Sequence, residues 1–205
     1  AESTRERYTD YIVRRLFPEG YADPALRTFA RAFAGRQELR DVCFYRFCQA
    51  EPLMFTIADD LLLPAIGTGR LSRERLRQYL AERFPAAKST NDCAKAIADA
   101  LCAGGVASVD PTRLSFAYRE PPVASFAFVL HSEFPEPAMY DIARLEKAPA
   151  LRALLWNPDG LLTSLYELRN QGLIAKVSEI DSFRQFTTKW TLLKVVEDLV
   201  QRASP

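Results

Sequence analysis

Residues 71–118 read LSRERLRQYLAERFPAAKSTNDCAKAIADALCAGGVASVDPTRLSFAY, and this stretch decides the fold. A serine N-cap and apolar residues at helical spacing predict a first helix that ends at Phe84. A second helix begins at Ser89 or Thr90 and ends at Gly104–Gly105. Two short apolar strands joined by an Asp-Pro-Thr turn follow. Helix, turn, helix and hairpin is the element order of a winged helix.

The same order returns in the C-terminal half. Residues 157–159 open a leucine-patterned helix that ends at Gly172, and two short strands flank a polar turn at 179–182. Gly105 and Gly172 are 67 residues apart. Two further apolar pairs share this offset, Leu101 with Leu168 and Ala98 with Leu165. The chain therefore repeats an architecture rather than a sequence.

These patterns predict a mainly α protein of three parts. Residues 1–66 form an N-terminal helical bundle, residues 67–120 a first winged-helix-like unit and residues 121–205 a second, each unit with a small β-hairpin wing. Further helices are predicted at 123–134, 140–146, 150–156 and 192–201. A chain of 205 residues with 48% hydrophobic and 26% charged residues can bury a core of this kind.

Motifs of catalysis are absent from the sequence, which has no HExxH, no GxSxG and no glycine-rich phosphate loop. The single histidine, His131, lies in an apolar helix, where a satisfied or surface histidine is more common than a catalytic one. Asp59 and Asp60 point about 100° apart on a helix, so they favour a contact to arginine over a shared metal. We expect no enzymatic activity, no metal and no cofactor.

Four cysteines, at positions 43, 48, 93 and 102, lack the Cys-x-x-Cys spacing of zinc and redox sites. Their apolar surroundings predict small buried hydrophobes with free thiols, as in a reducing cytoplasm. The longest apolar run, near 52–66, is too short and too charged to span a bilayer. We therefore expect a cytoplasmic chain that does not contact a membrane.

Charge is nearly balanced, with 27 Lys+Arg against 26 Asp+Glu, so DNA binding would need local clustering of cations. Basic residues gather from 70 to 88, and the second helix of a winged helix enters the major groove. Lysine and arginine neutralise phosphates, and serine, threonine and asparagine donate to phosphates or bases. The candidate DNA contacts of the first unit are Arg70, Arg73, Arg77, Lys88, Ser89, Thr90, Asn91, Lys95 and Arg113.

An arginine face in solvent, balanced by Glu74 and Glu82, explains the same pattern without DNA. The second unit is acidic at its helix start, with Asp159 and Glu167, and these side chains would repel phosphate. Its candidate DNA contacts lie on the wing and are Lys176, Arg184 and Lys189. That unit either uses its wing or serves as an interaction module.

Three segments carry a resemblance to a known family: PLMFTIADDLLLPAI at 52–66, LSRERLRQYLAERF at 71–84 and STNDCAKAIADALCAGGVAS at 89–108. Together they resemble the BrxA family of BREX phage-defence systems, helical proteins similar to NusB-type bundles joined to a winged helix. The resemblance implies binding to double-stranded DNA. The positions that match its DNA-facing helix are Ser89, Thr90, Asn91 and Lys95.

The chain departs from that family in two places. Its first fifty residues do not follow the family's start, and residues 122–205 add a second winged unit. We therefore expect a non-enzymatic DNA-binding protein, an accessory of a bacterial defence system, with other defence proteins and a second copy of the chain as further partners. Two alternatives stay open: a protein-interaction scaffold built on winged-helix modules, and a transcription regulator with a small-molecule pocket that no sequence feature marks.

Overall fold

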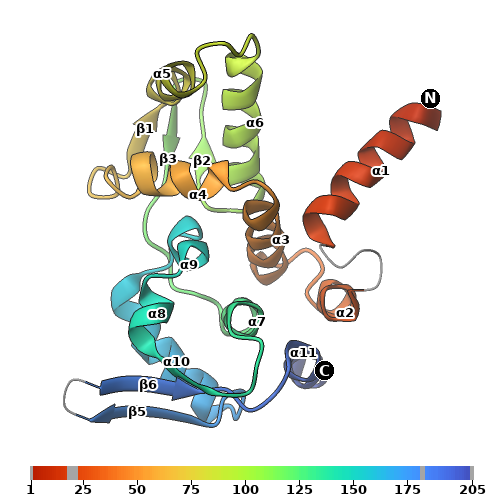
Figure 1. Cartoon of the computed structure of the whole chain (residues 1–205), viewed down its shortest axis with the longest axis vertical. Helices are drawn as coiled ribbons and strands as arrows, with labels where there is room; N and C mark the ends of the chain where they lie inside the picture. The colour runs from red at the N-terminus through yellow and green to blue at the C-terminus, as the bar shows by residue number, and fades with distance from the viewer. Residues whose placement is uncertain (1, 18–22, 181–182, 204–205) are drawn as a thin grey trace.

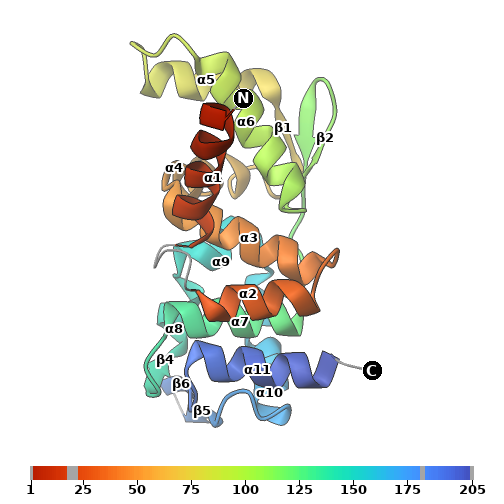
Figure 2. The same cartoon turned by 90° about the vertical axis from the view of Figure 1, so that its right-hand side faces the viewer.

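A computed structural model describes residues 2–17, 23–180 and 183–203 of the chain. Within these ranges it contains eleven α-helices and two three-stranded antiparallel sheets. The molecule is elongated, with one sheet toward each end and a stack of helices between them (Figures 1 and 2). The prediction of a mainly α protein with small β-sheets is confirmed. No helix of the described residues is long and apolar enough to cross a membrane.

The N-terminal helices begin where local signals place them. Asp23 caps the second helix by accepting a hydrogen bond from the backbone N–H of Leu26 at 2.9 Å, and Pro24 occupies its first turn. The fourth helix continues into one π-helical turn, Ala58–Leu62. The helices are α1 (Glu2–Leu16), α2 (Pro24–Ala32), α3 (Gln37–Ala50) and α4 (Leu53–Ile57).

The next segment contains a strand that the sequence analysis missed. Leu71 pairs with Leu114, so residues 70–72 form the first strand of a sheet of order β1-β3-β2. The two predicted hairpin strands are shorter than expected. The elements are β1 (Arg70–Ser72), α5 (Arg73–Arg83), α6 (Thr90–Ala103), β2 (Ser108–Val109) and β3 (Arg113–Ser115).

The last segment repeats this arrangement with a sheet of order β4-β6-β5. The helix predicted at 140–146 is wrong at its start, because residues 139–141 pair with β6. The predicted turn at 179–182 is wrong at its start, because residues 179–180 pair with β6, and residues 181–182 lie outside the described residues. The elements are α7 (Val123–Glu133), β4 (Met139–Asp141), α8 (Ile142–Glu146), α9 (Pro149–Ala153), a 3₁₀ turn (Pro158–Gly160), α10 (Leu161–Asn170), β5 (Lys176–Ile180), β6 (Phe183–Thr187) and α11 (Leu192–Ala203).

The two sheets are built in the same register. In each, the central strand carries a fully buried residue, Leu114 or Phe186, between an apolar residue of the preceding strand and one of its hairpin partner. The neighbours are Leu71 and Val109 in the first sheet and Tyr140 and Val177 in the second. Each sheet thus packs one apolar row against its own helices.

The helices before the two hairpins end identically. Gly105 has φ 70° and Gly172 has φ 71°, a backbone region that glycine enters without steric cost. The N–H of the residue after each glycine donates to the carbonyl oxygen of Leu101 at 2.9 Å or of Leu168 at 2.8 Å. These are Schellman-type helix ends. The 67-residue offset seen in the sequence therefore marks equivalent backbone positions.

Helix α3 joins the two halves of the molecule. It contacts α1, α6, α7 and α9, and α2 lies against the C-terminal α11 (Figure 2). One continuous cluster of buried apolar residues runs through 1–66, 67–120 and 121–205. Packing across the chain therefore links all three ranges.

Asp41 of α3 lies at the junction and is fully buried. Its carboxylate accepts hydrogen bonds from Gln37 Nε2 at 2.8 Å, from Arg119 Nη2 at 3.0 Å and from Ser125 Oγ at 3.1 Å. Arg119 belongs to the segment between the two sheets, and Ser125 belongs to α7. The carboxylate thus ties α3 to the start of the second half.

Asp41→Ala is expected to lower the free energy of unfolding by roughly 3 kcal/mol, because the half-buried Arg119 guanidinium loses its ionic partner and Gln37 and Ser125 lose a hydrogen-bond acceptor. Urea denaturation followed by circular dichroism measures the change. Glu74→Ala is the control, since it removes an exposed ion pair with Arg77 and should cost about 1 kcal/mol or less. Equal losses in the two variants would contradict a special role for Asp41.

Candidate nucleic-acid interface

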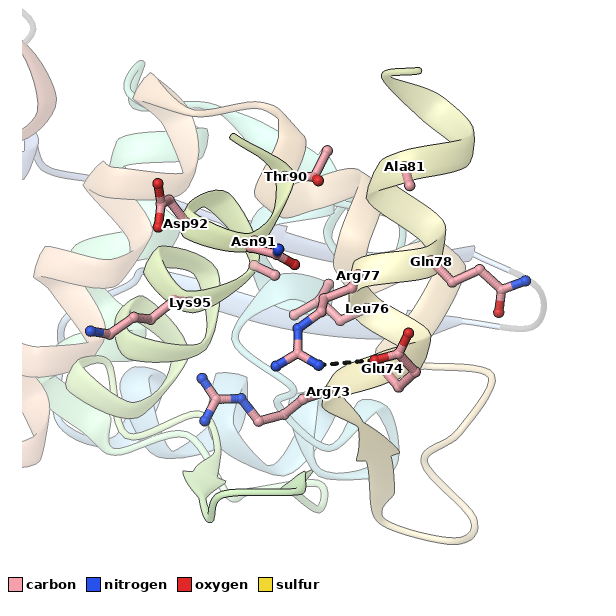
Figure 3. Close-up of a pocket in the computed structure, with 11 residues that line it drawn as sticks. Arg73, Glu74, Leu76, Arg77, Gln78, Ala81, Thr90, Asn91, Asp92 and Lys95 are labelled. Atoms are coloured by element: carbon pink, nitrogen blue, oxygen red, sulfur yellow. Dashed lines mark hydrogen bonds and ion pairs between the residues drawn. The ribbon is translucent and has the colours of Figure 1, made fainter. Parts of the chain in front are cut away.

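A groove of about 690 Å³ runs between α5 and α6. Arg73 and Arg77 point from α5 toward α6, and Asn91 and Lys95 of α6 lie on the other side of the groove (Figure 3). The two arginines are four residues apart, which places them on one side of the helix. The structure thus brings these candidate residues of α5 and α6 to the two sides of one groove.

Local packing explains why these arginines face the groove. Ser72 caps α5 by accepting a hydrogen bond from the Arg75 N–H at 3.0 Å. Leu76 and Leu80 then turn the apolar side of the helix into the core. Arg73 and Arg77 flank that side and are half-buried, so their stems pack while their guanidinium groups reach the groove.

Cations outnumber carboxylates in the groove. Arg73, Arg77 and Lys95 line it together with Glu74 and Asp92. Arg77 Nη1 pairs with Glu74 at 2.9 Å, and no ion pair forms at Arg73 or Lys95 within the described ranges. These two cations are therefore available to an anionic ligand.

The wider segment concentrates the positive charge of the chain. Residues 70–95 hold seven basic and three acidic side chains, a net charge of +4, whereas the whole chain has +1. The other residues therefore sum to −3. Although the net charge of the chain is close to zero, α5, α6 and their connection form a basic surface.

The other predicted contacts of the first unit lie around this groove. Arg70 is exposed on β1, and Lys88 and Ser89 are exposed in the connection between α5 and α6. Thr90 and Asn91 line the groove at the start of α6. Ser89 occupies the N-cap position, but its side chain makes no capping hydrogen bond. Its hydroxyl is therefore not used by the helix.

Arg113 lies on the first wing and is held by Asp110. The Asp110 carboxylate accepts the backbone N–H groups of Thr112 at 2.7 Å and Arg113 at 2.8 Å, and Arg113 Nε at 3.0 Å. These hydrogen bonds, with that of the Thr112 N–H first, lower the pKa of Asp110 to about 2. The carboxylate is ionised at neutral pH and offsets the charge of Arg113.

The second unit places different residues at the equivalent positions. Asp141 caps α8 as Ser72 caps α5, accepting the Ala143 N–H at 2.8 Å. Counting from these caps, Arg73 corresponds to Ile142, which is fully buried, and Arg77 corresponds to Glu146. Residues 139–162, the counterpart of 70–95, hold three basic and three acidic side chains. The basic groove is therefore confined to the first unit.

In the second unit, residues 119–120 contact the segment just before α10, the helix that precedes the second hairpin. Arg119 and Trp156 form a parallel bridge in which the Arg119 N–H donates to the Leu155 carbonyl oxygen and the Asn157 N–H to the Arg119 carbonyl oxygen, both at 2.9 Å. Asn157 Nδ2 also donates to the Glu120 carboxylate at 2.9 Å. The segment between the units thus covers the place where a second recognition helix would begin.

The adjacent carboxylates of Asp59 and Asp60 contact side chains of both units. Asp59 forms an ion pair with Arg152 of α9 at 3.0 Å, which confirms the predicted contact with an arginine. Asp60 accepts the hydroxyl of Tyr79 at 2.6 Å. The first contact binds α9 of the second unit to the π-helical turn, and the second binds that turn to α5.

Two of the three predicted wing cations have partners in the chain. Arg184 pairs with Glu146 at 2.9 Å, and the Lys189 ammonium lies 4.0 Å from the centre of the Trp190 ring. Lys176 is exposed on β5, an edge strand. The structure does not bring these three residues into the groove of the first unit.

An apolar surface on the second sheet was not predicted. Met139, Ile180 and Phe183 are 62%, 64% and 70% exposed. Ile180 pairs with Phe183, Met139 pairs with Thr187, and Phe183 and Thr187 are four residues apart on one strand. All three apolar residues therefore lie on the outer face. The sequence did contain a signal for this surface. Phe183 and Phe186 are three residues apart on one strand, so they must lie on opposite faces of the sheet.

Residues with reactive side chains do not gather into a site. His131 is fully buried, its Nδ1 hydrogen-bonds to the Ala127 carbonyl oxygen at 3.0 Å, and burial lowers its pKa. Of the four cysteines predicted to be buried, only Cys48 is; Cys43 and Cys93 are half-buried, and Cys102 is exposed because it lies on the solvent side of α6. Across residues 2–17, 23–180 and 183–203, no group of three His, Cys, Asp or Glu side chains could hold a metal ion.

Asp92→Asn should make the groove bind polyanions more tightly, because it removes one of two carboxylates beside three cations. A heparin column measures this as elution at higher salt than for the wild type. Asp159→Asn, at the start of the helix in the second unit, is the control and should leave the elution unchanged. A shift of equal size in both variants would show a response to net charge alone.

No protein-family model, curated protein or solved structure matches the chain, so function is inferred from this groove and its residues.

Proposed function

We propose that this chain is a non-enzymatic protein that binds double-stranded DNA through its first unit. In this proposal both units are winged helices. The order of elements in each is a helix, a short strand, one or two helices, a recognition helix and a hairpin. The repeated sheet orders β1-β3-β2 and β4-β6-β5 support this reading. In it, α6 is the helix that enters the major groove.

One observation carries the proposal: two units of the same construction differ in charge where DNA would bind. Residues 70–95 have a net charge of +4, and the equivalent residues 139–162 have none. An arginine face kept only for solubility would not need to lie in a groove beside the exposed start of a helix. Cations at that place neutralise phosphates and release counterions.

Side-chain positions orient the duplex. Asn91 and Lys95 are exposed on α6, and so are Asp92 and Asp99 on neighbouring turns. Carboxylates repel phosphate, so the phosphate strand runs on the α5 side, over Arg73 and Arg77. Asn91 is then the side chain best placed to reach a base edge.

The second unit takes a different role in this proposal. Its helix start is covered by residues 119–120, and its positions equivalent to Arg73 and Arg77 are Ile142 and Glu146. It acts as a docking unit that holds the first unit in place. The resemblance of residues 52–109 to the BrxA family extends the proposal to an accessory role in bacterial phage defence, and that extension rests on the resemblance alone.

The double variant Arg73→Glu with Arg77→Glu should weaken binding to a fluorescent 30-base-pair duplex of random sequence by roughly tenfold or more. Losing two phosphate contacts should also lower the slope of log affinity against log salt by about 2. Fluorescence anisotropy at several salt concentrations measures both. Arg27→Glu with Arg31→Glu is the matched control, with the same spacing and charge change on exposed positions of α2.

The proposal fails if the wild type shows no salt-dependent binding, or if the two double variants lose affinity equally. The first outcome excludes DNA as the ligand. The second shows that total charge, and not the groove, governs binding.

A docking scaffold for proteins is the second candidate function, favoured by the exposed Met139, Ile180 and Phe183 on the outer sheet face. Ile180→Ser with Phe183→Ser should leave duplex affinity within about twofold of the wild type, because phosphate contacts dominate affinity and this face lies outside the basic groove. The same anisotropy titration tests it. A large loss of DNA affinity would place the second wing on the duplex instead.

A further inference from the structure

A second cavity, of about 410 Å³, lies between α1, α3 and α6. Its floor is one face of α3, with Leu39, Cys43 and Phe47 at successive intervals of four residues. All three are half-buried. The cavity is therefore an apolar stripe of α3 that no side chain among the described residues fully covers.

The walls explain why the stripe stays open. Leu16 at the end of α1 lines one side, and Ala100 and Ala103 in the last turns of α6 line the other. Alanine side chains are too short to fill the space above Phe47 and Leu39. The opening thus follows from small residues on α6 and not from a gap between domains.

Charge at this cavity has one sign. Arg36 and Arg40 line it, and no acidic residue does so within the described part of the chain. Arg40 donates from Nε to the Ala103 carbonyl oxygen at 2.8 Å and from Nη2 to the Cys102 carbonyl oxygen at 2.7 Å. Its charge therefore meets only neutral oxygens, whereas Arg36 pairs with Glu38.

We propose that this cavity binds a small, largely apolar organic acid. Its aromatic or aliphatic body lies on Leu39, Cys43 and Phe47, and its acidic group meets the guanidinium groups of Arg36 and Arg40. Ligand pockets for small molecules have volumes of about 300–1,000 Å³ and combine apolar walls with a few polar groups. A cavity of about 410 Å³ with helices on two sides suits a small molecule better than a protein segment.

This inference is independent of DNA binding. The ligand would contact the last turn of α6, whose carbonyl oxygens Arg40 already holds. It would therefore lie against the end of α6 that is distant from the basic groove.

The test uses 1-anilinonaphthalene-8-sulfonate, an aromatic sulfonate whose fluorescence rises in apolar sites, and the intact chain. We expect saturable binding of one molecule per chain. Ala103→Phe, which fills the cavity, should weaken binding at least tenfold, and Ala96→Phe, two turns earlier on the same exposed side of α6, should not. Arg36→Gln should weaken the sulfonate severalfold but leave the uncharged N-phenyl-1-naphthylamine unaffected.

A second measurement needs no variant. Excess sulfonate should slow the reaction of iodoacetamide with Cys43, which lines the cavity, at least fivefold while the exposed Cys102 reacts at an unchanged rate. Peptide mass spectrometry measures both rates. The proposal is overturned if Cys43 is not protected, or if fluorescence survives in Ala103→Phe and is lost in the sheet variant with Ile180→Ser and Phe183→Ser.

Discussion

A buried carboxylate sets the geometry on which the groove depends. Asp41 would be costly in the core without partners, and its hydrogen bonds come from α3 itself, from the inter-unit segment and from α7. Gln37, one of those donors, also donates to the Gly104 carbonyl oxygen at the end of α6. Arg40 holds the two preceding carbonyl oxygens. One side of α3 thus fixes the second half of the chain, and the same helix fixes the end of α6.

The two units share an architecture but not a sequence. Strand register, helix caps and glycine-terminated helices are shared, because each of them is required by the scaffold. The positions one and five residues after the cap are not required by the scaffold, and in the first unit they face the groove. There the first unit carries Arg73 and Arg77, and the second carries Ile142 and Glu146, which join the core and the Arg184 ion pair. Equivalent helix positions therefore line a basic groove in the first unit and make internal contacts in the second.

Much of the candidate site could be predicted from the sequence, and some could not. The clustering of cations near Arg73 and the helix start at Thr90 follow from local spacing, and both line the groove. Whether a cation is already neutralised depends on residues distant in the chain, as Arg184 shows with Glu146, 38 positions away. The cavity over Cys43 likewise arises because α1 and α6 approach α3 without covering it. Periodicity says which face of a helix is apolar, but not what lies against it.

The sequence by itself determined the order of helices and hairpins, the caps at Asp23 and Ser72, and the helix ends at Gly105 and Gly172. Each of these depends on hydrogen bonds or backbone angles within a few residues. Only the tertiary structure decided that residues 70–72 and 139–141 are strands, because three residues hold an extended conformation only when a partner strand supplies hydrogen bonds. It also decided that the start of α6 is exposed while the equivalent helix start is bridged to residues 119–120, since those contacts join elements far apart in the chain.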